Sequence, residues 1–187
     1  MSRYDVFHLV SREFSKARIN HVLIGGFAVN FHQYSRNTGD VDFLMAEKDY
    51  EKALPLLEKG GYKEMVRQPL FARLKNEDPG MMDVDIMFVD EPTFEGIFKE
   101  GKRAKIEDVE FVVPSLNHLL ALKLHSLKHN PRRLAPDLVD LDNLVKINQI
   151  DVRSKEFREL CLKFGTSEIY EALLGGQGYG KIKLPGF

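Results

Sequence analysis

Four aspartates stand in two Asp-x-Asp pairs, each inside an apolar stretch that predicts a β-strand. The pairs are Asp40 with Asp42 and Asp83 with Asp85. Because side chains alternate along a strand, both carboxylates of a pair point to the same side. Carboxylates that repel one another need a counter-charge, and hard divalent cations such as Mg2+ take carboxylate oxygens. If the two strands are neighbours, three or four carboxylates converge and could hold two metal ions for phosphoryl or nucleotidyl transfer.

A single Asp-x-Asp pair would be weak evidence, because a strand end can simply expose both carboxylates to water. Aspartate is disfavoured inside strands, and burying an unpaired carboxylate costs several kcal/mol. Two apolar strands that both carry such a pair therefore favour a functional site over a structural accident.

A glycine pair precedes the first aspartate strand. Gly25-Gly26 follows the short apolar strand of residues 22–24, and we expect it to form a turn before a helix of residues 27–35. Glycine lets the backbone approach a phosphate closely, and the next helix would aim its N-terminus there. Arg36 and Thr38, in the loop entering the aspartate strand, are predicted to touch phosphate or the metal-binding carboxylates.

The remaining elements are read from apolar periodicity. We expect helices over residues 2–18, 47–60 (with Pro55 causing a kink or a late start), 92–99, 115–130, 136–147 and 154–174. Strands are expected over residues 62–65, 70–75 and 81–89, and residues 105–113 read as a hairpin or one strand. The predicted organisation is an α/β core of residues 1–113, a helical region of residues 114–174 and a flexible glycine-rich tail of residues 175–187.

This pattern resembles the polymerase-β-type nucleotidyltransferase superfamily. The resemblance rests on Gly25-Gly26, on Arg36-x-Thr38-x-Asp40-x-Asp42 and on the later apolar strand with an aspartate. It implies an α/β (α+β) fold with a mixed sheet flanked by helices, a Gly-Gly element at the nucleotide phosphates, and three carboxylates that hold Mg2+. Asp85 is the preferred third carboxylate, because Val84-Asp85-Ile86-Met87-Phe88 matches the family strand best, and Asp83 stays an alternative ligand. The third carboxylate would act as general base or as metal ligand.

A closer resemblance is to the small bacterial branch with aminoglycoside nucleotidyltransferases and toxin-type enzymes of abortive-infection and toxin–antitoxin systems. It spans residues 20–148 and rests on Gly25-Gly26-Phe27-Ala28, Leu122-Lys123-Leu124 and an Arg-x-x-x-Asp-x-x-Asp motif ending in Asp137 and Asp140. It implies that Lys123 contacts a phosphate and that the two aspartates position Lys123 or the acceptor. On the residues alone, Lys123 could equally extend its ammonium group into water, and Asp137 and Asp140 could pair with Arg132 or Arg133.

The expected activity is transfer of a nucleoside monophosphate from an NTP to an acceptor hydroxyl or phosphate, with release of pyrophosphate. The acceptor could be RNA, including tRNA, or a small molecule, since the formal charge of −1 favours neither. Four cations in residues 123–133 could hold an RNA backbone: Lys123, Lys128, Arg132 and Arg133. Two alternatives remain open, a metal-dependent hydrolase and a non-catalytic regulatory protein of the same fold, such as a toxin–antitoxin component with an antitoxin partner.

Bulk composition sets the broad class. The chain has 187 residues, of which 43% are hydrophobic, enough for one compact domain or a domain with a helical appendage. The single cysteine, Cys161, excludes an internal disulfide framework. Without a long apolar run or a signal-peptide pattern, we expect a cytoplasmic protein with no membrane contact.

Overall fold

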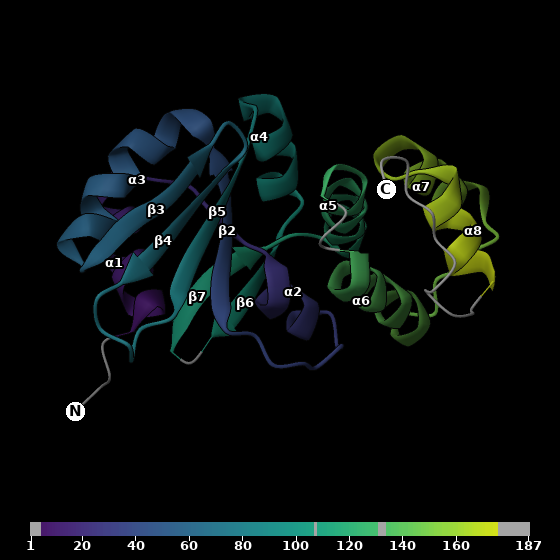
Figure 1. The fold of residues 1–187 in the computed structure, drawn as a ribbon, viewed down its shortest axis with the longest axis horizontal. Helices are drawn as coiled ribbons and strands as arrows, with labels where there is room; N and C mark the ends of the chain where they lie inside the picture. The colour runs from purple at the N-terminus through teal and green to yellow at the C-terminus, as the bar shows by residue number, and fades with distance from the viewer. Residues whose placement is uncertain (1–4, 107, 131–133, 176–187) are drawn as a thin grey trace. The chain divides into compact units, whose positions relative to one another are not determined.

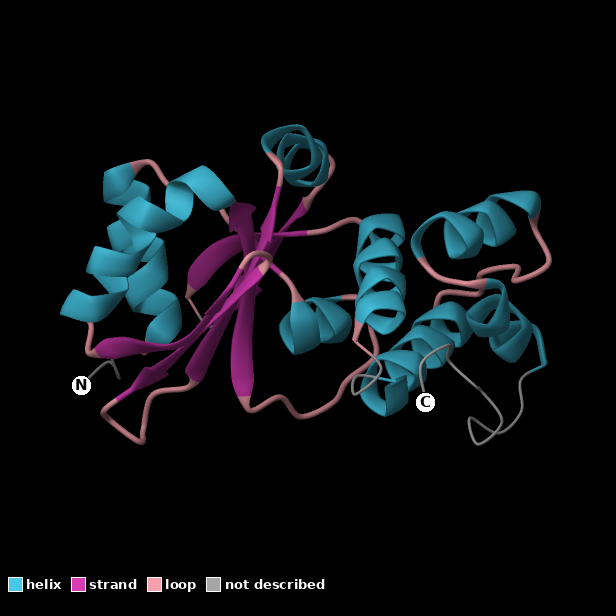
Figure 2. Cartoon of the chain, turned by 45° about the horizontal axis from the view of Figure 1, so that its top comes forward, coloured by secondary structure: helices cyan, strands magenta, loops and turns pink. Residues whose placement is uncertain are grey.

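The computed structural model describes residues 5–106, 108–130 and 134–175. Contacts divide the chain into two compact units: residues 1–31 with 36–115 form unit 1, and residues 32–35 with 116–187 form unit 2. Figure 2 shows the helices in cyan and the strands in magenta. The described strands all belong to unit 1, and the regular elements described in unit 2 are helices. The fold class is α+β.

Unit 1 is built on a mixed five-stranded sheet with the strand order β1-β2-β5-β4-β3. Its strands are β1 (Val22–Leu23), β2 (Asp40–Ala46), β3 (Tyr62–Gln68), β4 (Phe71–Asn76) and β5 (Asp83–Val89). The neighbours β2 and β5 run parallel, and the other pairs are antiparallel. The two aspartate-bearing strands therefore lie side by side at the middle of the sheet.

Within its described residues, unit 1 contains four helices, two of which begin at a side-chain cap. They are α1 (Val6–Ala17), α2 (Gly25–Phe31), α3 (Glu47–Lys59) and α4 (Glu91–Lys99). The Asp5 carboxylate accepts a hydrogen bond from the His8 backbone N–H at 3.0 Å, and Asp90 does the same for Thr93. These are the interactions that satisfy free N–H groups at a helix start. Pro55 lies inside α3, which runs from Glu47 without a late start.

One face of the sheet carries the hydrophobic core. Figure 1 shows α1 and α3 together on one side of the strands, and their apolar residues pack in a single cluster with alternate residues of β2 and β5. The sheet residues of that cluster include Val41, Phe43, Met45, Val84, Ile86 and Phe88. The hairpin of β6 (Lys102–Ile106) and β7 (Val109–Val113) adds Ala104, Phe111 and Val113 to it. Because side chains alternate, the intervening aspartates must point to the opposite face.

Unit 2 contains α5 (Leu116–His129), α6 (Leu134–Ile147), α7 (Lys155–Phe164) and α8 (Ser167–Gly175). The single helix expected over residues 154–174 is wrong. The chain leaves α7 at Gly165, and the Thr166 hydroxyl accepts from the Ile169 backbone N–H at 3.4 Å to start α8. A glycine followed by a capping threonine ends one helix and starts the next.

Two further expectations need comment. The helix predicted over residues 27–35 begins and ends earlier than expected, at Gly25 and Phe31. Gly25 and Gly26 form the first turn of α2 rather than a turn before it. Residues 176–187 of the predicted flexible tail lie outside the described part of the chain. Within the described ranges, no helix combines the length and apolarity needed to cross a membrane.

Candidate active site

Strand pairing brings the two Asp-x-Asp pairs together. In the parallel register of β2 and β5, Asp40 stands opposite Asp83 and Asp42 opposite Asp85. Carboxylate oxygens of Asp40, Asp42 and Asp85 lie within 4.8 Å of one another. The apolar residues that flank them on the two strands are buried in the core, namely Val41, Phe43, Val84 and Ile86. The packing of these side chains fixes the strand face that carries the carboxylates.

Asp85 and Asp83 have different surroundings. The Asp85 side chain is only 8% exposed and belongs to the cluster of three oxygens. The Asp83 side chain is 37% exposed and lies 3.5 Å from the Lys75 ammonium group. The geometry thus groups Asp85, not Asp83, with Asp40 and Asp42.

Arg73 was not anticipated from the sequence. It lies on β4 opposite Asp85, and its Nε and Nη2 donate to the two Asp85 oxygens at 2.7 and 2.5 Å. This hydrogen bonding to Asp85 is the main cause that raises the pKa of the Arg73 guanidinium. The only sequence signal was the alternation in β4 of the polar residues Arg73 and Lys75 with the buried Ala72 and Leu74. That alternation does not show which residue of β5 pairs with Arg73.

Gly25 lies directly against the second aspartate. Its φ is +61°, in the left-handed region that favours glycine, and a Cβ added there would overlap the Asp42 carboxylate. The Ile24 backbone N–H also donates to the Asp42 carbonyl at 2.9 Å. The start of α2 is therefore fitted closely to the Asp42 side chain.

Gly26 and Thr38 make the next contact, between α2 and the loop that leads into the aspartate strand β2. A Cβ on Gly26 would lie 2.5 Å from Thr38 Oγ1 and 2.6 Å from Thr38 Cβ. The Thr38 hydroxyl lies 3.1 Å from the Asp40 carbonyl oxygen and 3.2 Å from Asp40 Oδ1, and can donate to either. Thr38 thus orients the first carboxylate of the cluster.

The loop before β2 is pinned by Asn30, a second residue that the sequence did not single out. The Asn30 amide donates to the Arg36 carbonyl at 3.0 Å and accepts from the Arg36 N–H at 2.9 Å. The Arg36 guanidinium donates to the Asn37 carbonyl at 3.1 Å. Arg36 is therefore placed in the loop that leads to Asp40, with its backbone fixed at α2.

Lys123, Asp137 and Asp140 form a buried ion-pair network within unit 2. The Lys123 Nζ lies 2.7 Å from Asp137 Oδ1 and 2.7 Å from Asp140 Oδ2, and all three side chains are at most 6% exposed. The Ser126 hydroxyl donates to Asp137 Oδ2 at 2.7 Å. The interpretation of Lys123 as a lysine with its head in water is wrong. Arg132 and Arg133, expected as alternative partners, lie outside the described residues.

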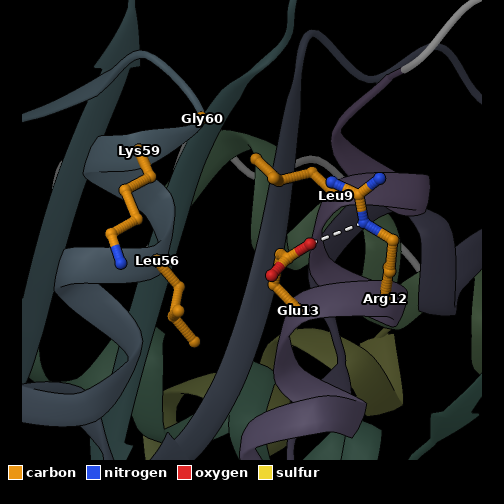
Figure 3. Close-up of a pocket in the computed structure, with 6 residues that line it drawn as sticks. All are labelled: Leu9, Arg12, Glu13, Leu56, Lys59 and Gly60. Carbon is orange, nitrogen blue, oxygen red and sulfur yellow. Dashed lines mark hydrogen bonds and ion pairs between the residues drawn. The ribbon is translucent and has the colours of Figure 1, made fainter.

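A surface hollow of about 220 Å³ lies between α1 and α3 (Figure 3). Its lining residues are Leu9, Arg12, Glu13, Leu56, Lys59 and Gly60. Arg12 and Glu13 pair with each other there, at 2.5 Å. The helices α1 and α3 pack on the apolar face of the sheet, so this hollow lies on the opposite side from the carboxylate cluster and plays no part in the site.

The residues present fit a divalent cation. The cluster offers three carboxylate oxygens within 4.8 Å and no nitrogen or sulfur donor, which suits a hard ion such as Mg2+. Asp40, Asp42 and Asp85 are the residues that could hold it, and the Cβ-free backbone of Gly25 leaves the Asp42 carboxylate room to do so.

Comparison with solved structures identifies the architecture. The chain aligns with the lincosamide antibiotic adenylyltransferase LnuA in its lincomycin-bound form at a TM-score of 0.55 and 20% identity, covering 79% of this chain and 98% of LnuA. The chain has the nucleotidyltransferase fold. The complex of ANT(2")-Ia with adenylyl-2"-tobramycin aligns at a TM-score of 0.54 and 13% identity, over 91% of this chain and 94% of that protein.

A nucleotidyltransferase-like protein from Paracoccidioides brasiliensis gives similar values, with a TM-score of 0.52 and 16% identity over 87% of this chain and 88% of that one. No protein-family model matches the sequence, and neither does any curated protein. The nucleotidyltransferase fold that the family resemblance implied is confirmed by these structures, and the roles of individual residues stay predictions.

Proposed function

We propose that the protein is a nucleotidyltransferase that uses a divalent cation, most simply Mg2+, to move a nucleoside monophosphate from an NTP to an acceptor. The observation that carries the proposal is the convergence of Asp40, Asp42 and Asp85 within 4.8 Å on two neighbouring parallel strands. Three like charges this close repel one another, and the Arg73 guanidinium at Asp85 brings a single positive charge to the cluster. A bound divalent cation would offset more of that repulsion. A protein that only bound a partner through this fold would gain nothing from three carboxylates whose repulsion lowers its stability.

In the proposed reaction, an acceptor oxygen forms a bond to the α-phosphorus as the bond to the α–β bridging oxygen breaks and pyrophosphate leaves. When bound, Mg2+ supplies charge stabilisation for the attacking and leaving oxygens, and two ions are expected. Asp40 and Asp42 would hold the ions, with Thr38 orienting Asp40. Asp85 would act as a metal ligand, since each of its oxygens keeps a second lone pair beside the one that accepts from Arg73. The proton of an acceptor hydroxyl then passes to solvent.

Four further residues are proposed to bind the donor nucleotide. The backbone of Gly25 and Gly26 at the start of α2 would approach the triphosphate, because neither position carries a Cβ. Arg36 would offer positive charge to the phosphates from the loop before Asp40. Lys123 is retained as a phosphate contact on the family resemblance alone, with Asp137 and Asp140 positioning it.

The acceptor is proposed as RNA or a small molecule. LnuA and ANT(2")-Ia, which share the fold, were solved with lincomycin and with adenylyl-2"-tobramycin, so antibiotics are the first small molecules to test. The antitoxin-type protein partner and the cytoplasmic location stay predictions.

The test uses each of the four NTPs labelled at the α-phosphate, with Mg2+ and two acceptor pools: total RNA, and a panel of aminoglycosides and lincosamides. We expect label to move to one pool with equimolar pyrophosphate release. Asp42→Asn should reduce transfer at least about 100-fold, because loss of one metal ligand removes charge stabilisation of the transition state. Asp83→Asn is the matched control on the same face, and it should stay within about threefold. Equal transfer by Asp42→Asn and the wild type would contradict the proposal.

A further inference from the structure

Arg73 and Asp85 form a two-pronged ion pair at the edge of the carboxylate cluster. The Arg73 Nε donates to Asp85 Oδ1 at 2.7 Å, and Nη2 donates to Oδ2 at 2.5 Å. The Asp85 side chain is 8% exposed and that of Arg73 is 41% exposed. A guanidinium that grips both oxygens fixes the plane of the carboxylate as well as its charge.

This ion pair lets the fold hold Asp85 beside the other two aspartates without a bound ion. A carboxylate this deeply buried costs several kcal/mol if no charge compensates it, and Asp40 and Asp42 add like charge within 4.8 Å. The antiparallel register of β4 and β5 sets Arg73 directly opposite Asp85. The counter-charge therefore comes from a rigid neighbouring strand, and not from a mobile loop.

The same ion pair opposes a cation at the cluster. Any ion that takes an Asp85 oxygen must share that carboxylate with a guanidinium already attached to it. A unit charge and a divalent ion about 5 Å apart repel by about 1.5 kcal/mol even at the dielectric constant of water, which corresponds to about tenfold in affinity.

We propose that Arg73 is a positioning residue that holds the Asp85 carboxylate in place and weakens divalent-ion binding until the donor arrives. The negative charge of the NTP triphosphate offsets the guanidinium, so ion and nucleotide bind together rather than one after the other. This inference rests on the proposed function, because it assumes that Asp40, Asp42 and Asp85 are the metal ligands.

The chain supplies a matched control two residues further along β4. Lys75 lies on the same face of that strand and pairs with Asp83 at 3.5 Å, outside the cluster of three oxygens. A substitution that removes the Lys75 charge takes away one positive charge, as does one at Arg73. It does not release any of the three carboxylates proposed to bind the metal. A difference between the two positions therefore reports the contact with Asp85.

The experiment measures Mn2+ binding without nucleotide by electron paramagnetic resonance at low ionic strength, where bound Mn2+ loses the signal of the free ion. Arg73→Gln and Arg73→Met both remove the charge. Arg73→Met, which keeps an unbranched apolar side chain, serves if Arg73→Gln fails to fold. Each should bind Mn2+ about tenfold more tightly than the wild type. Arg73→Lys, which keeps the charge, and Lys75→Gln should each stay within about threefold of it.

Mn2+ binding by Arg73→Met that is unchanged or weaker would overturn the inference, because Arg73 would then only support Asp85. The same titration of the wild type with an NTP present separates the two levels of the argument. Suppose that the wild type binds Mn2+ when the NTP is present, but that Arg73→Gln and Arg73→Met bind Mn2+ without nucleotide no more tightly than the wild type does. In that case only the Arg73 inference fails. If the wild type binds Mn2+ neither with nor without any NTP, the proposed function fails and the inference falls with it.

Discussion

The backbone of Gly25 lies against the carboxylate of Asp42, so closely that no side chain fits between them. Gly25 has a φ of +61°, which an L-residue rarely adopts. The first residue of α2 therefore has to lack a Cβ for the Asp42 side chain to keep its position. Glycine at this position serves the placement of Asp42 as well as the approach of a phosphate.

Gly25→Ala should disturb the site more than the fold. The new Cβ would displace the Asp42 carboxylate, and the strained φ should cost about 1–3 kcal/mol of unfolding free energy. Urea denaturation checks the stability, and Mg2+-dependent NTP binding by calorimetry, which we expect to be lost, checks the site.

Gly39→Ala is the control for that substitution, because a Cβ there would meet nothing within 4 Å and its φ lies outside the left-handed region. We expect its stability to change by less than about 0.5 kcal/mol and its nucleotide binding to stay intact. Normal nucleotide binding by Gly25→Ala would show that Asp42 does not need its present position.

Lys123→Met should destabilise unit 2 strongly. Lys123 balances two carboxylates that are almost fully buried, Asp137 and Asp140. Removing one partner of a buried ion pair leaves an uncompensated charge and costs about 3–5 kcal/mol. Urea denaturation monitored by hydrogen exchange in α5 and α6 measures this loss.

Lys146→Met is the comparison for Lys123→Met. Its ammonium group pairs with Asp142 at 2.6 Å but is 61% exposed, so we expect a change below about 1 kcal/mol. Equal stability of the two variants would mean that the buried aspartates do not depend on Lys123 for their counter-charge.

His21 predicts how stability falls in acid. Burial among Phe14, Phe43 and Phe111 lowers the pKa of His21 to about 4, although its Nδ1–H donates to the Ile19 carbonyl at 3.2 Å. The unfolded chain binds this proton near pH 6.5 and the native protein only near pH 4. The free energy of unfolding should therefore decrease by about 3 kcal/mol as the pH falls through that window.

His21→Phe removes this titration, so its stability should lose that part of the acid dependence between pH 6.5 and pH 4. The measurement is the unfolding free energy of both proteins at half-unit pH steps. The slope is the readout, since the lost hydrogen bond to Ile19 shifts the whole curve of the variant. Parallel curves for the two proteins would show that the pKa of His21 is not lowered in the native protein.

Alternation along the strands predicted much of the site. Because Asp40 and Asp42 are two residues apart, as are Asp83 and Asp85, their shared face followed from the geometry of a strand. Whether the two strands are neighbours, and in which register, depends on tertiary contacts. The choice between Asp83 and Asp85 accordingly rested on family resemblance, and the structure adds the contacts that distinguish them.

The partners of these aspartates could not be predicted for the same reason. Arg73 meets Asp85 only through the pairing of β4 with β5. Asn30 reaches Arg36 only because α2 ends at Phe31, earlier than the predicted end at residue 35. The break between α7 and α8 was missed because the sequence reads as helical both before Gly165 and after Thr166, so the two helices were predicted as one.

The most direct measurement is the thermal unfolding midpoint with each NTP, with and without Mg2+, for the wild type, Asp42→Asn and Asp83→Asn. A ligand that binds only the native state at about 100 times its Kd stabilises by about 2.7 kcal/mol, or roughly 5 °C or more for a chain of this size. We predict such a rise for the wild type and Asp83→Asn only when Mg2+ and the preferred NTP are both present, and none for Asp42→Asn. An equal rise in Asp42→Asn, or no rise in the wild type with any NTP, would contradict a nucleotidyl-transfer site built on these carboxylates.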